Sequence, residues 1–262
     1  MANILQPDAV RKEYGLTIQQ KIIPWGAVWN KDSGSFHKGD PYKADLLLSR
    51  GSGKAAAVCI HNTGRITTVA GTTPAEQYTR ATWPNCNMGD VRVHYFVDWE
   101  SAWQNLREDE VGWHASDGTY GPGNNTSIAV EIIMDGSGDD RDVAAQRNGA
   151  LLAAILLHRH GLELDPGLQN HHHYSPGGKN CPVYLLPHWP AFTEQVGGYL
   201  EAVRSAADDT VDLLTPAPAP PEDGALYRVQ VGAFGKKENA AAMLDRLEKA
   251  GFEGYVKKDE NA

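Results

Sequence analysis

The chain has 262 residues, of which 41% are hydrophobic and 22% are charged, as is typical of a folded globular protein with a full core. Its formal net charge of −9 argues against a nucleic-acid-binding protein, which would normally carry a basic face. No apolar run approaches the roughly 20 residues that a membrane-spanning helix needs, so we expect no membrane-embedded segment. Three cysteines, an odd number, indicate reduced thiols rather than a disulfide framework.

The first 204 residues alternate between strand-like and helix-like segments. Short segments that are apolar, or rich in β-branched and aromatic residues, predict strands at 55–62, 91–99 and 126–134. Helices are predicted over 72–84, 141–162 and 189–203. Thr73 is the expected N-cap of the first helix, and Gly161 is expected to end the second. This alternation predicts an α/β fold with a mixed central β-sheet flanked by helices.

The composition changes sharply at residues 205–224, which combine alternating alanine and proline with acidic side chains. Such a segment is stiff and cannot form a helix or a central strand. We therefore predict a linker there, between a large domain at 1–204 and a tail at 225–262. The tail has the pattern of a small strand-helix-strand module, and so few residues make a poor core on their own.

The segment at 170–182, NHHHYSPGGKNCP, places three histidines before a turn rich in Gly and Pro. A catalytic zinc site usually has three protein ligands and an open position for water. Cys181 and one upstream histidine can supply two ligands, and His61, at the end of a predicted strand, is the best candidate for the third. Cys59 is a rival ligand on the same strand face, although a small buried core residue is the more usual role.

These residues belong to a longer pattern of motifs, which are IHNTG (60–64), HYFVD (94–98), WHASDG (113–118), NNTSIAVEI (124–132) and HHHYSPGGKNCP (171–182). In this order they resemble the zinc N-acetylmuramoyl-L-alanine amidases. That group includes bacteriophage endolysins, bacterial cell-wall amidases and animal peptidoglycan-recognition proteins. The resemblance covers about 120 residues of the predicted large domain.

The resemblance implies a zinc ion held by His61, His171 and Cys181, with bacterial peptidoglycan as the substrate. In the family, the second histidine ligand precedes the aromatic or apolar residue of the turn by three positions. Here that residue is Tyr174, which points to His171. Relatives with a shorter turn would point to His173 instead, so both assignments stay open, with His171 favoured by the longer turn.

The resemblance also gives Glu131 the role of catalytic base. A lone carboxylate in an apolar strand is costly to bury unless it is paired or used, and pairing with a structural Arg or Lys is the alternative. Lys179 lies two residues from Cys181 and could stabilise an oxyanion, or could be an ordinary exposed turn lysine. Trp113 and His114 are candidate substrate contacts, against the alternative of a core tryptophan and a surface histidine.

The tail resembles half of a sporulation-related (SPOR) repeat domain, a module of peptidoglycan-binding type that has two strand-helix-strand repeats when complete. This predicts wall targeting by a truncated module or by two tails that pair in a homodimer. The leading functional hypothesis is hydrolysis of the bond between N-acetylmuramic acid and L-alanine, by an endolysin or an autolysin. A non-catalytic recognition module and a zinc hydrolase of soluble muropeptides are the alternatives. Because no secretory signal is predicted, we expect synthesis in the cytoplasm and action on the wall after phage lysis or export by a non-classical route.

Overall fold

The structure is a computed structural model that describes residues 5–23, 47–65, 70–82, 91–118, 120–214, 236–249 and 256. The chain divides into two compact units, Met1–Thr215 and Pro216–Ala262. In the second unit, the predicted helix is present as α8 (Lys237–Lys249), and the two predicted strands fall almost wholly outside the described residues. Among the described residues, no helix combines the length and the apolar character that a membrane crossing requires.

Part of the predicted linker is packed on the first unit. The backbone N–H of Tyr14 donates to the carbonyl of Asp209 at 2.7 Å, and that of Leu213 donates to the carbonyl of Tyr14 at 2.9 Å. Leu213 is partly buried against the main hydrophobic core. The first compact unit thus extends to Thr215, beyond the boundary predicted at residue 204. Composition alone did not reveal the apolar side chains that hold this acidic segment to the core.

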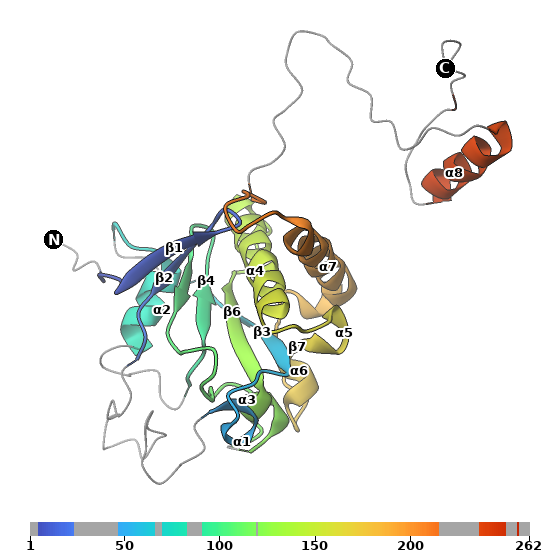
Figure 1. Cartoon of the computed structure of the whole chain (residues 1–262). Helices are drawn as coiled ribbons and strands as arrows, with labels where there is room; N and C mark the ends of the chain where they lie inside the picture. Colours follow the sequence, from blue (N-terminus) through green and yellow to red (C-terminus); the bar gives the residue numbers. More distant parts are fainter. Residues whose placement is uncertain are drawn as a thin grey trace, which may run out of the picture. The chain divides into compact units, whose positions relative to one another are not determined.

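In the described part of the chain, seven strands form one mixed sheet with the order β1-β2-β5-β4-β6-β3-β7 (Figure 1). The strands are β1 (Ala9–Glu13), β2 (Leu16–Gln20), β3 (Ala57–Thr63), β4 (Tyr95–Val97), β5 (Ala102–Gln104), β6 (Ser127–Ile133) and β7 (Leu168–Asn170). The pairs β4–β6, β6–β3 and β3–β7 are parallel, whereas β1–β2 and β5–β4 are antiparallel. The predicted mixed sheet is confirmed, with β4 shorter than the sequence indicated.

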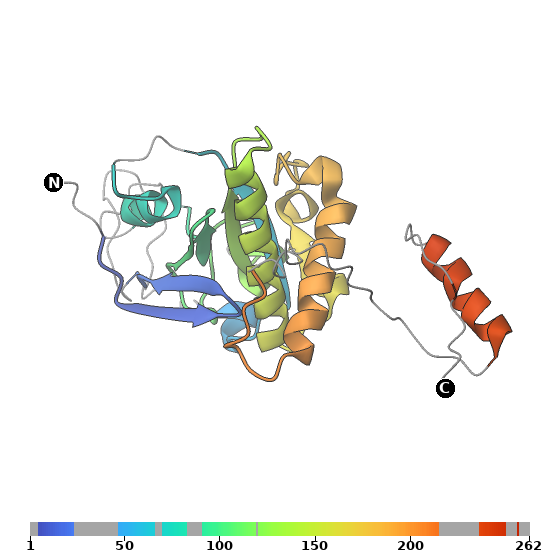
Figure 2. The same cartoon turned by 90° about the horizontal axis from the view of Figure 1, so that it is seen from above.

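Helices cover both faces of this sheet (Figures 1 and 2). The first unit contains α1 (Leu48–Gly51), α2 (Pro74–Thr82), α3 (Pro122–Thr126), α4 (Asp140–Arg159), α5 (Leu164–Gly167), α6 (His171–Tyr174), the 3₁₀ helix η1 (Leu186–His188) and α7 (Trp189–Ser205). Helices α4 and α7 pack against each other and contribute to the larger hydrophobic cluster, whereas α2 packs on a smaller cluster. All three helices predicted for this unit are present.

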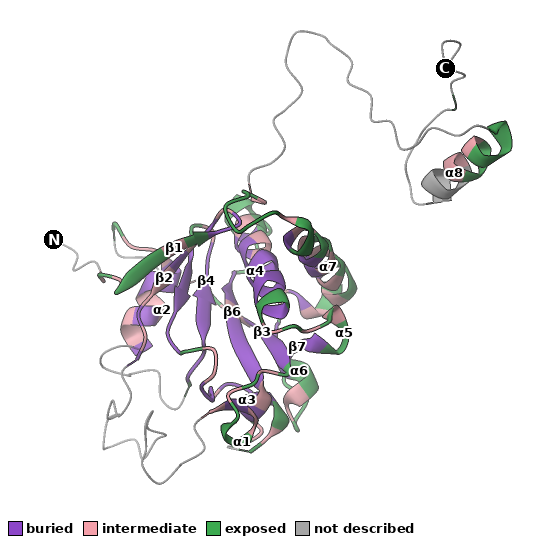
Figure 3. Cartoon of the chain, viewed as in Figure 1, coloured by how far each residue is buried: buried purple, intermediate pink, exposed green. Residues whose placement is uncertain are grey.

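The alternation of side chains along β3 decides where a site can form. Val58 and Ile60 point into the larger cluster with α4 and α7, and the central strands are buried (Figure 3). Because neighbouring strand residues point to opposite faces, Cys59 and His61 lie on the other face. The side chains of Cys59 and His61 are thereby kept out of the main core.

The approach of α4 to β6 depends on a glycine. A Cβ atom at Gly149 would lie 2.3 Å from Cδ1 of Ile132, whereas one at exposed Gly198 in α7 would meet nothing within 4 Å. We expect Gly149→Ala to lower the free energy of unfolding by about 1–3 kcal/mol through overpacking. Gly198→Ala should raise it by about 0.5–1 kcal/mol, because alanine favours a helix. Urea denaturation measures both, and an equal gain in the two variants would contradict the tight contact.

Glu108 links β4 to the C-terminal end of α4. Its carboxylate accepts hydrogen bonds from Tyr95 Oη at 2.5 Å, Arg159 Nη1 at 2.5 Å and His160 Nε2 at 2.8 Å. Burial alone would raise the pKa of Glu108, but the hydrogen bond with His160 and the charge of Arg159 lower it to about 2. The charged carboxylate therefore stabilises the folded chain.

This pKa predicts how stability depends on pH. Because the folded-state pKa of Glu108 lies below its ordinary value of 4.5, the stabilisation is complete above about pH 4.5 and is lost as the pH falls through about 2. We expect Glu108→Gln to lower the free energy of unfolding at pH 7 by up to about 3 kcal/mol. The difference from wild type should shrink towards pH 2 in urea titrations, and a difference that is independent of pH would contradict this assignment.

Candidate metal centre and active site

Two neighbouring strands and the segment after a third bring the predicted site residues together. His61 lies near the carboxyl end of β3, and its register partner on β6 is Glu131. On the other side of β3, Ile60 pairs with Asn170, the last residue of β7. His171 follows directly as the first residue of α6, so the parallel register places it beside His61.

Backbone hydrogen bonds fold the glycine- and proline-rich turn back onto this position. The N–H of His172 donates to the carbonyl of Cys181 at 2.8 Å, and Nδ1 of His172 lies 3.0 Å from the carbonyl oxygen of Lys179. Beyond the turn, Oδ1 of Asn62 accepts a hydrogen bond from the N–H of Tyr184 at 3.1 Å. These bonds hold Cys181 next to the end of β3, as a shared metal site requires.

The three predicted ligands meet at Nδ1 of His61. Nδ1 of His171 lies 3.0 Å away and Sγ of Cys181 lies 3.7 Å away, and all three side chains are buried. With zinc–nitrogen bonds of about 2.05 Å and a zinc–sulfur bond of about 2.3 Å, a tetrahedral site separates two nitrogens by about 3.3 Å and nitrogen from sulfur by about 3.6 Å. The three donor atoms therefore fit a zinc ion.

The protonation states of these groups also suit a metal. Burial, together with the neighbouring histidines and Lys179, holds the pKa of His61 well below its usual range. Burial and the charge of Lys179 lower the pKa of His171 to about 4, so both rings are neutral at pH 7. Burial and Glu131 raise the pKa of the Cys181 thiol to about 11. A bound cation would displace that proton, since thiols bind metals as thiolates.

Glu131 faces the same group of ligands. Its Oε1 lies 3.9 Å from Nδ1 of His61, and 15% of its side chain is exposed. Among the residues that the structure describes, Oε2 of Glu131 has no hydrogen-bond partner, and no arginine or lysine forms an ion pair with this carboxylate. Burial raises the pKa of Glu131 to about 7, against the opposing charge of Lys179. A carboxylate in this state is suited to accepting a proton near neutral pH.

A second group of donors lies on the other side of the His61 ring. Sγ of Cys59 is 3.3 Å and Nδ1 of His114 is 3.0 Å from Nε2 of His61. Both groups are buried, but the partly exposed carboxylate of Glu131 lies beside Nδ1 of His61, with its Oε1 3.9 Å away. A hydrolytic metal site needs such a base next to the ligands, so the group around Nδ1 of His61 is the better candidate.

The two predicted substrate contacts lie in one loop but in different surroundings. His114 is only 7% exposed and contacts His61 from the buried side. Trp113 is half-buried, and its backbone pairs with Arg92 in a β-bridge. Lys179 is exposed, and its positive charge partly offsets the effect of burial, which raises the pKa of Glu131. Of the three residues, Lys179 and Trp113 are the ones whose side chains a substrate could reach.

Sequence reasoning did not identify the residues that support the site. Oδ1 of Asn124 accepts hydrogen bonds from the N–H groups of His114 at 2.7 Å and Ala115 at 2.8 Å. Both ring nitrogens of His94 form hydrogen bonds within the fold. Its Nε2 lies 2.9 Å from the carbonyl oxygen of Glu110, and its Nδ1 accepts the N–H of Ala129 at 3.0 Å. Asn124 lies inside one of the predicted motifs, and its position just before a strand was the available signal.

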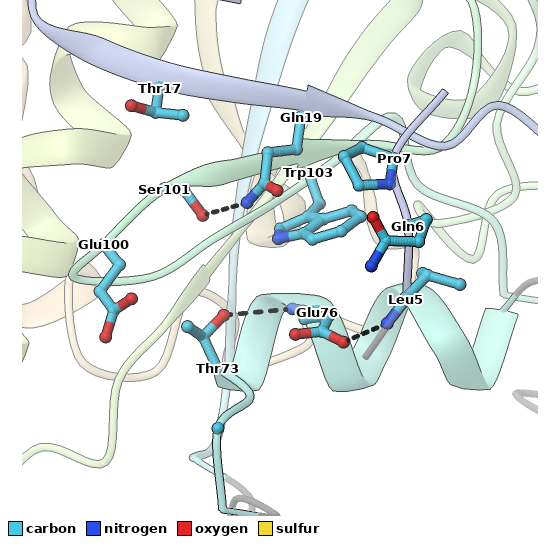
Figure 4. Close-up of a pocket in the computed structure, with 11 residues that line it drawn as sticks. Leu5, Gln6, Pro7, Thr17, Gln19, Thr73, Glu76, Glu100, Ser101 and Trp103 are labelled. Atoms are coloured by element: carbon cyan, nitrogen blue, oxygen red, sulfur yellow. Dashed lines mark hydrogen bonds between the residues drawn. The ribbon is translucent and has the colours of Figure 1, made fainter. Parts of the chain in front are cut away.

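A separate cavity of about 420 Å³ is lined by residues that include Gln19, Glu76 and Trp103 (Figure 4). Trp103 of β5 forms part of its wall. In the strand register, Trp103 pairs with Phe96 of β4, which in turn pairs with Glu131 of β6. Trp103 thus lies three strands from His61, or about 14 Å along the sheet. None of the predicted site residues lines this cavity, so the candidate active site is defined by its side-chain chemistry rather than by a concavity.

Two imidazoles, a thiol and a free carboxylate gathered near the carboxyl end of β3 define a candidate metal-dependent hydrolase. The chain belongs to the N-acetylmuramoyl-L-alanine amidase family, whose model matches residues 51–184. A second model, the SPOR domain, matches residues 202–261. The family resemblance expected from the motifs and from the tail is confirmed.

Curated relatives and solved structures agree with this family. The chain is 38% identical over 99 residues to the N-acetylmuramoyl-L-alanine amidase CwlH of Bacillus subtilis (strain 168), covering 38% of each protein. It is 37% identical over 105 residues to XlyA of the same organism, covering 40% of this chain and 33% of XlyA. The chain therefore spans less than half of the length of these relatives.

The fold matches a solved catalytic domain over nearly all of that domain. The structure of the catalytic domain of XlyA superposes with a TM-score of 0.52 at 28% identity, covering 69% of this chain and 99% of that domain. The structure of PlyL gives the same TM-score at 25% identity, covering 68% of this chain and 96% of PlyL. The first unit is therefore similar to known amidase and endolysin folds.

Proposed function

We propose that this protein is a zinc-dependent amidase that hydrolyses the bond between N-acetylmuramic acid and L-alanine in bacterial peptidoglycan. The observation that carries the proposal is the group of three donors around Nδ1 of His61, with the free carboxylate of Glu131 beside it. Amidases named for this reaction are the curated relatives that the chain matches. A non-catalytic recognition module would not need this combination of ligands and base.

His61, His171 and Cys181 are the proposed ligands. When bound there, a zinc ion would polarise the amide carbonyl and lower the pKa of a coordinated water to about 7. The two neutral histidines can coordinate without losing a proton, whereas the Cys181 thiol must lose one. Zinc affinity should therefore weaken as the solution becomes more acidic.

Glu131 is the proposed proton carrier. Its unpartnered Oε2 can accept a proton from the attacking water and return that proton to the leaving amine nitrogen. The ammonium group of Lys179 is the proposed partner for the negative charge that develops on the carbonyl oxygen. The indole of Trp113, which is half-buried in the loop before His114, is the proposed substrate contact.

Digestion of purified walls tests the proposed reaction. The zinc-loaded protein should release stem peptides with a free N-terminal L-alanine and leave the glycan chains intact, as mass analysis of the soluble products would show. Incubation with a chelator should stop the release, and added zinc should restore it. Binding to walls without any release would instead indicate a recognition module, and release of sugar fragments would indicate a different bond.

The second unit is the proposed wall-binding module. Deletion of residues 216–262 removes this unit and leaves the first compact unit whole. If two linked modules bind the same wall, losing one should weaken sedimentation of the protein with walls, by up to about 100-fold in apparent affinity. Hydrolysis of a soluble muropeptide should stay within about two-fold of the full chain. Unchanged sedimentation would show that the tail does not target the wall.

A further inference from the structure

The buried side of His61 carries an imidazole that the proposed reaction does not use. Nε2 of His61 and Nδ1 of His114 lie 3.0 Å apart, and the two rings meet edge to face with an interplanar angle of 87°. The distance fits an N–H···N hydrogen bond. The other neighbour of Nε2 is the Cys59 sulfur at 3.3 Å, and a thiol is a weak acceptor, so the nitrogen of His114 is the better partner.

The chain holds the His114 ring tightly in this position. Oδ1 of the buried Asn124 accepts hydrogen bonds from the backbone N–H groups of His114 and of the next residue, Ala115. Gly112 leaves the ring its space, because a Cβ atom at this position would lie 2.8 Å from Cδ2 of His114 and 3.2 Å from Cε1 of His94. A ring held by its backbone and packed against a glycine keeps one orientation towards His61.

We propose that His114 is a positioning residue for the metal centre. Its Nδ1 accepts the Nε2–H of His61, which fixes the tautomer of His61 that leaves Nδ1 as a lone pair facing His171 and Cys181. A neutral imidazole carries only one ring proton, so placing this proton on Nε2 makes Nδ1 available to zinc. The inference rests on the proposed zinc site, and it replaces the predicted substrate contact at His114.

The role of His114 is tested by comparing His114→Leu with His114→Asn. Leucine removes the acceptor, whereas the Oδ1 of asparagine can take the place of Nδ1 and accept the same proton. We expect the leucine variant to bind zinc about 10–100-fold more weakly in competition with a chromogenic chelator. The asparagine variant should stay within a few-fold of wild type. The melting temperatures of the metal-free proteins report whether each variant folds.

Wild-type affinity in a folded leucine variant would overturn the inference, and so would equal losses in the two variants, which would indicate packing alone. Ring-nitrogen NMR of the zinc-loaded wild-type protein gives a test that needs no variant. We expect the proton of His61 on Nε2, and a proton on Nδ1 would contradict the proposal. A wild-type protein that binds no zinc, or a His171→Ala variant with full affinity, would overturn the zinc site itself and can be told apart from these outcomes.

Discussion

Replacing Glu131 by glutamine is expected to lower the rate of wall hydrolysis about 10²–10⁴-fold, because the amide cannot take up the proton of the attacking water. Zinc affinity should change little, since Glu131 faces the ligands without being one of them. Initial rates on purified walls and zinc content measure the two effects. Glu100→Gln, at an exposed carboxylate on the rim of the separate cavity, is the control and should retain full activity. Near-normal hydrolysis by zinc-loaded Glu131→Gln would contradict the role of Glu131 as base.

The same substitution should stabilise the metal-free protein. Burial raises the folded-state pKa of Glu131 to about 7, above the ordinary 4.5, so the charged carboxylate opposes folding as the pH rises through this range. Above pH 7, Glu131→Gln is therefore expected to raise the free energy of unfolding, by up to about 3 kcal/mol. The gain should disappear below about pH 4.5, where the carboxyl group is neutral in both states. A variant that is less stable than wild type at pH 8 would show that Glu131 serves the fold rather than the reaction.

The second large effect is expected at the histidine run. His171 is buried next to His61, whereas His173 is exposed, although the two residues are separated by only one position. We expect His171→Ala to weaken zinc binding more than the roughly 10–100-fold that follows loss of an outer hydrogen-bond partner, and to abolish hydrolysis. His173→Ala should keep both properties, which makes the pair a matched comparison.

Zinc titration and wall hydrolysis, measured side by side for the two histidine variants, decide this assignment. A third variant, His61→Ala, should behave like His171→Ala. The Nδ1 atoms of the two rings lie next to each other, and both are proposed ligand atoms of the same ion. Loss of zinc in His173→Ala with retention in His171→Ala would mean that the turn adopts the register of the shorter-turn relatives. The proposed ligand set would then be wrong.

The fold was predictable where the sequence has a continuous apolar segment. The apolar strand around Val58 and the long helix over 141–162 appear as β3 and α4, both of which are largely buried. The hairpin of β1 and β2 was not predicted, since its first strand, AVRKE, is mostly exposed and charged at the sheet edge. Three-residue strands such as β7 (Leu168–Asn170) were also missed, because tertiary pairing rather than local pattern determines them.

The residues of the candidate metal group could be proposed from the sequence, but their arrangement could not. Motif resemblance favoured His171 over His173, and the register of β7 with β3 explains physically why His171 lies beside His61. The inward turn of His114 could not be read from the sequence, because it depends on the hydrogen bonds of Asn124 and the space beside Gly112. Contacts of this kind follow no sequence periodicity, so a periodic pattern does not reveal them.

X-ray absorption spectroscopy at the zinc edge tests the metal site most directly. For the zinc-loaded full chain, we predict one sulfur at about 2.3 Å together with nitrogen and oxygen ligands at about 2.0–2.1 Å. The Cys59→Ser variant should give the same spectrum, because the proposed site lies on the Nδ1 side of His61 with Cys181. Loss of the sulfur signal in Cys59→Ser would place the ion on the buried Nε2 side and contradict the account.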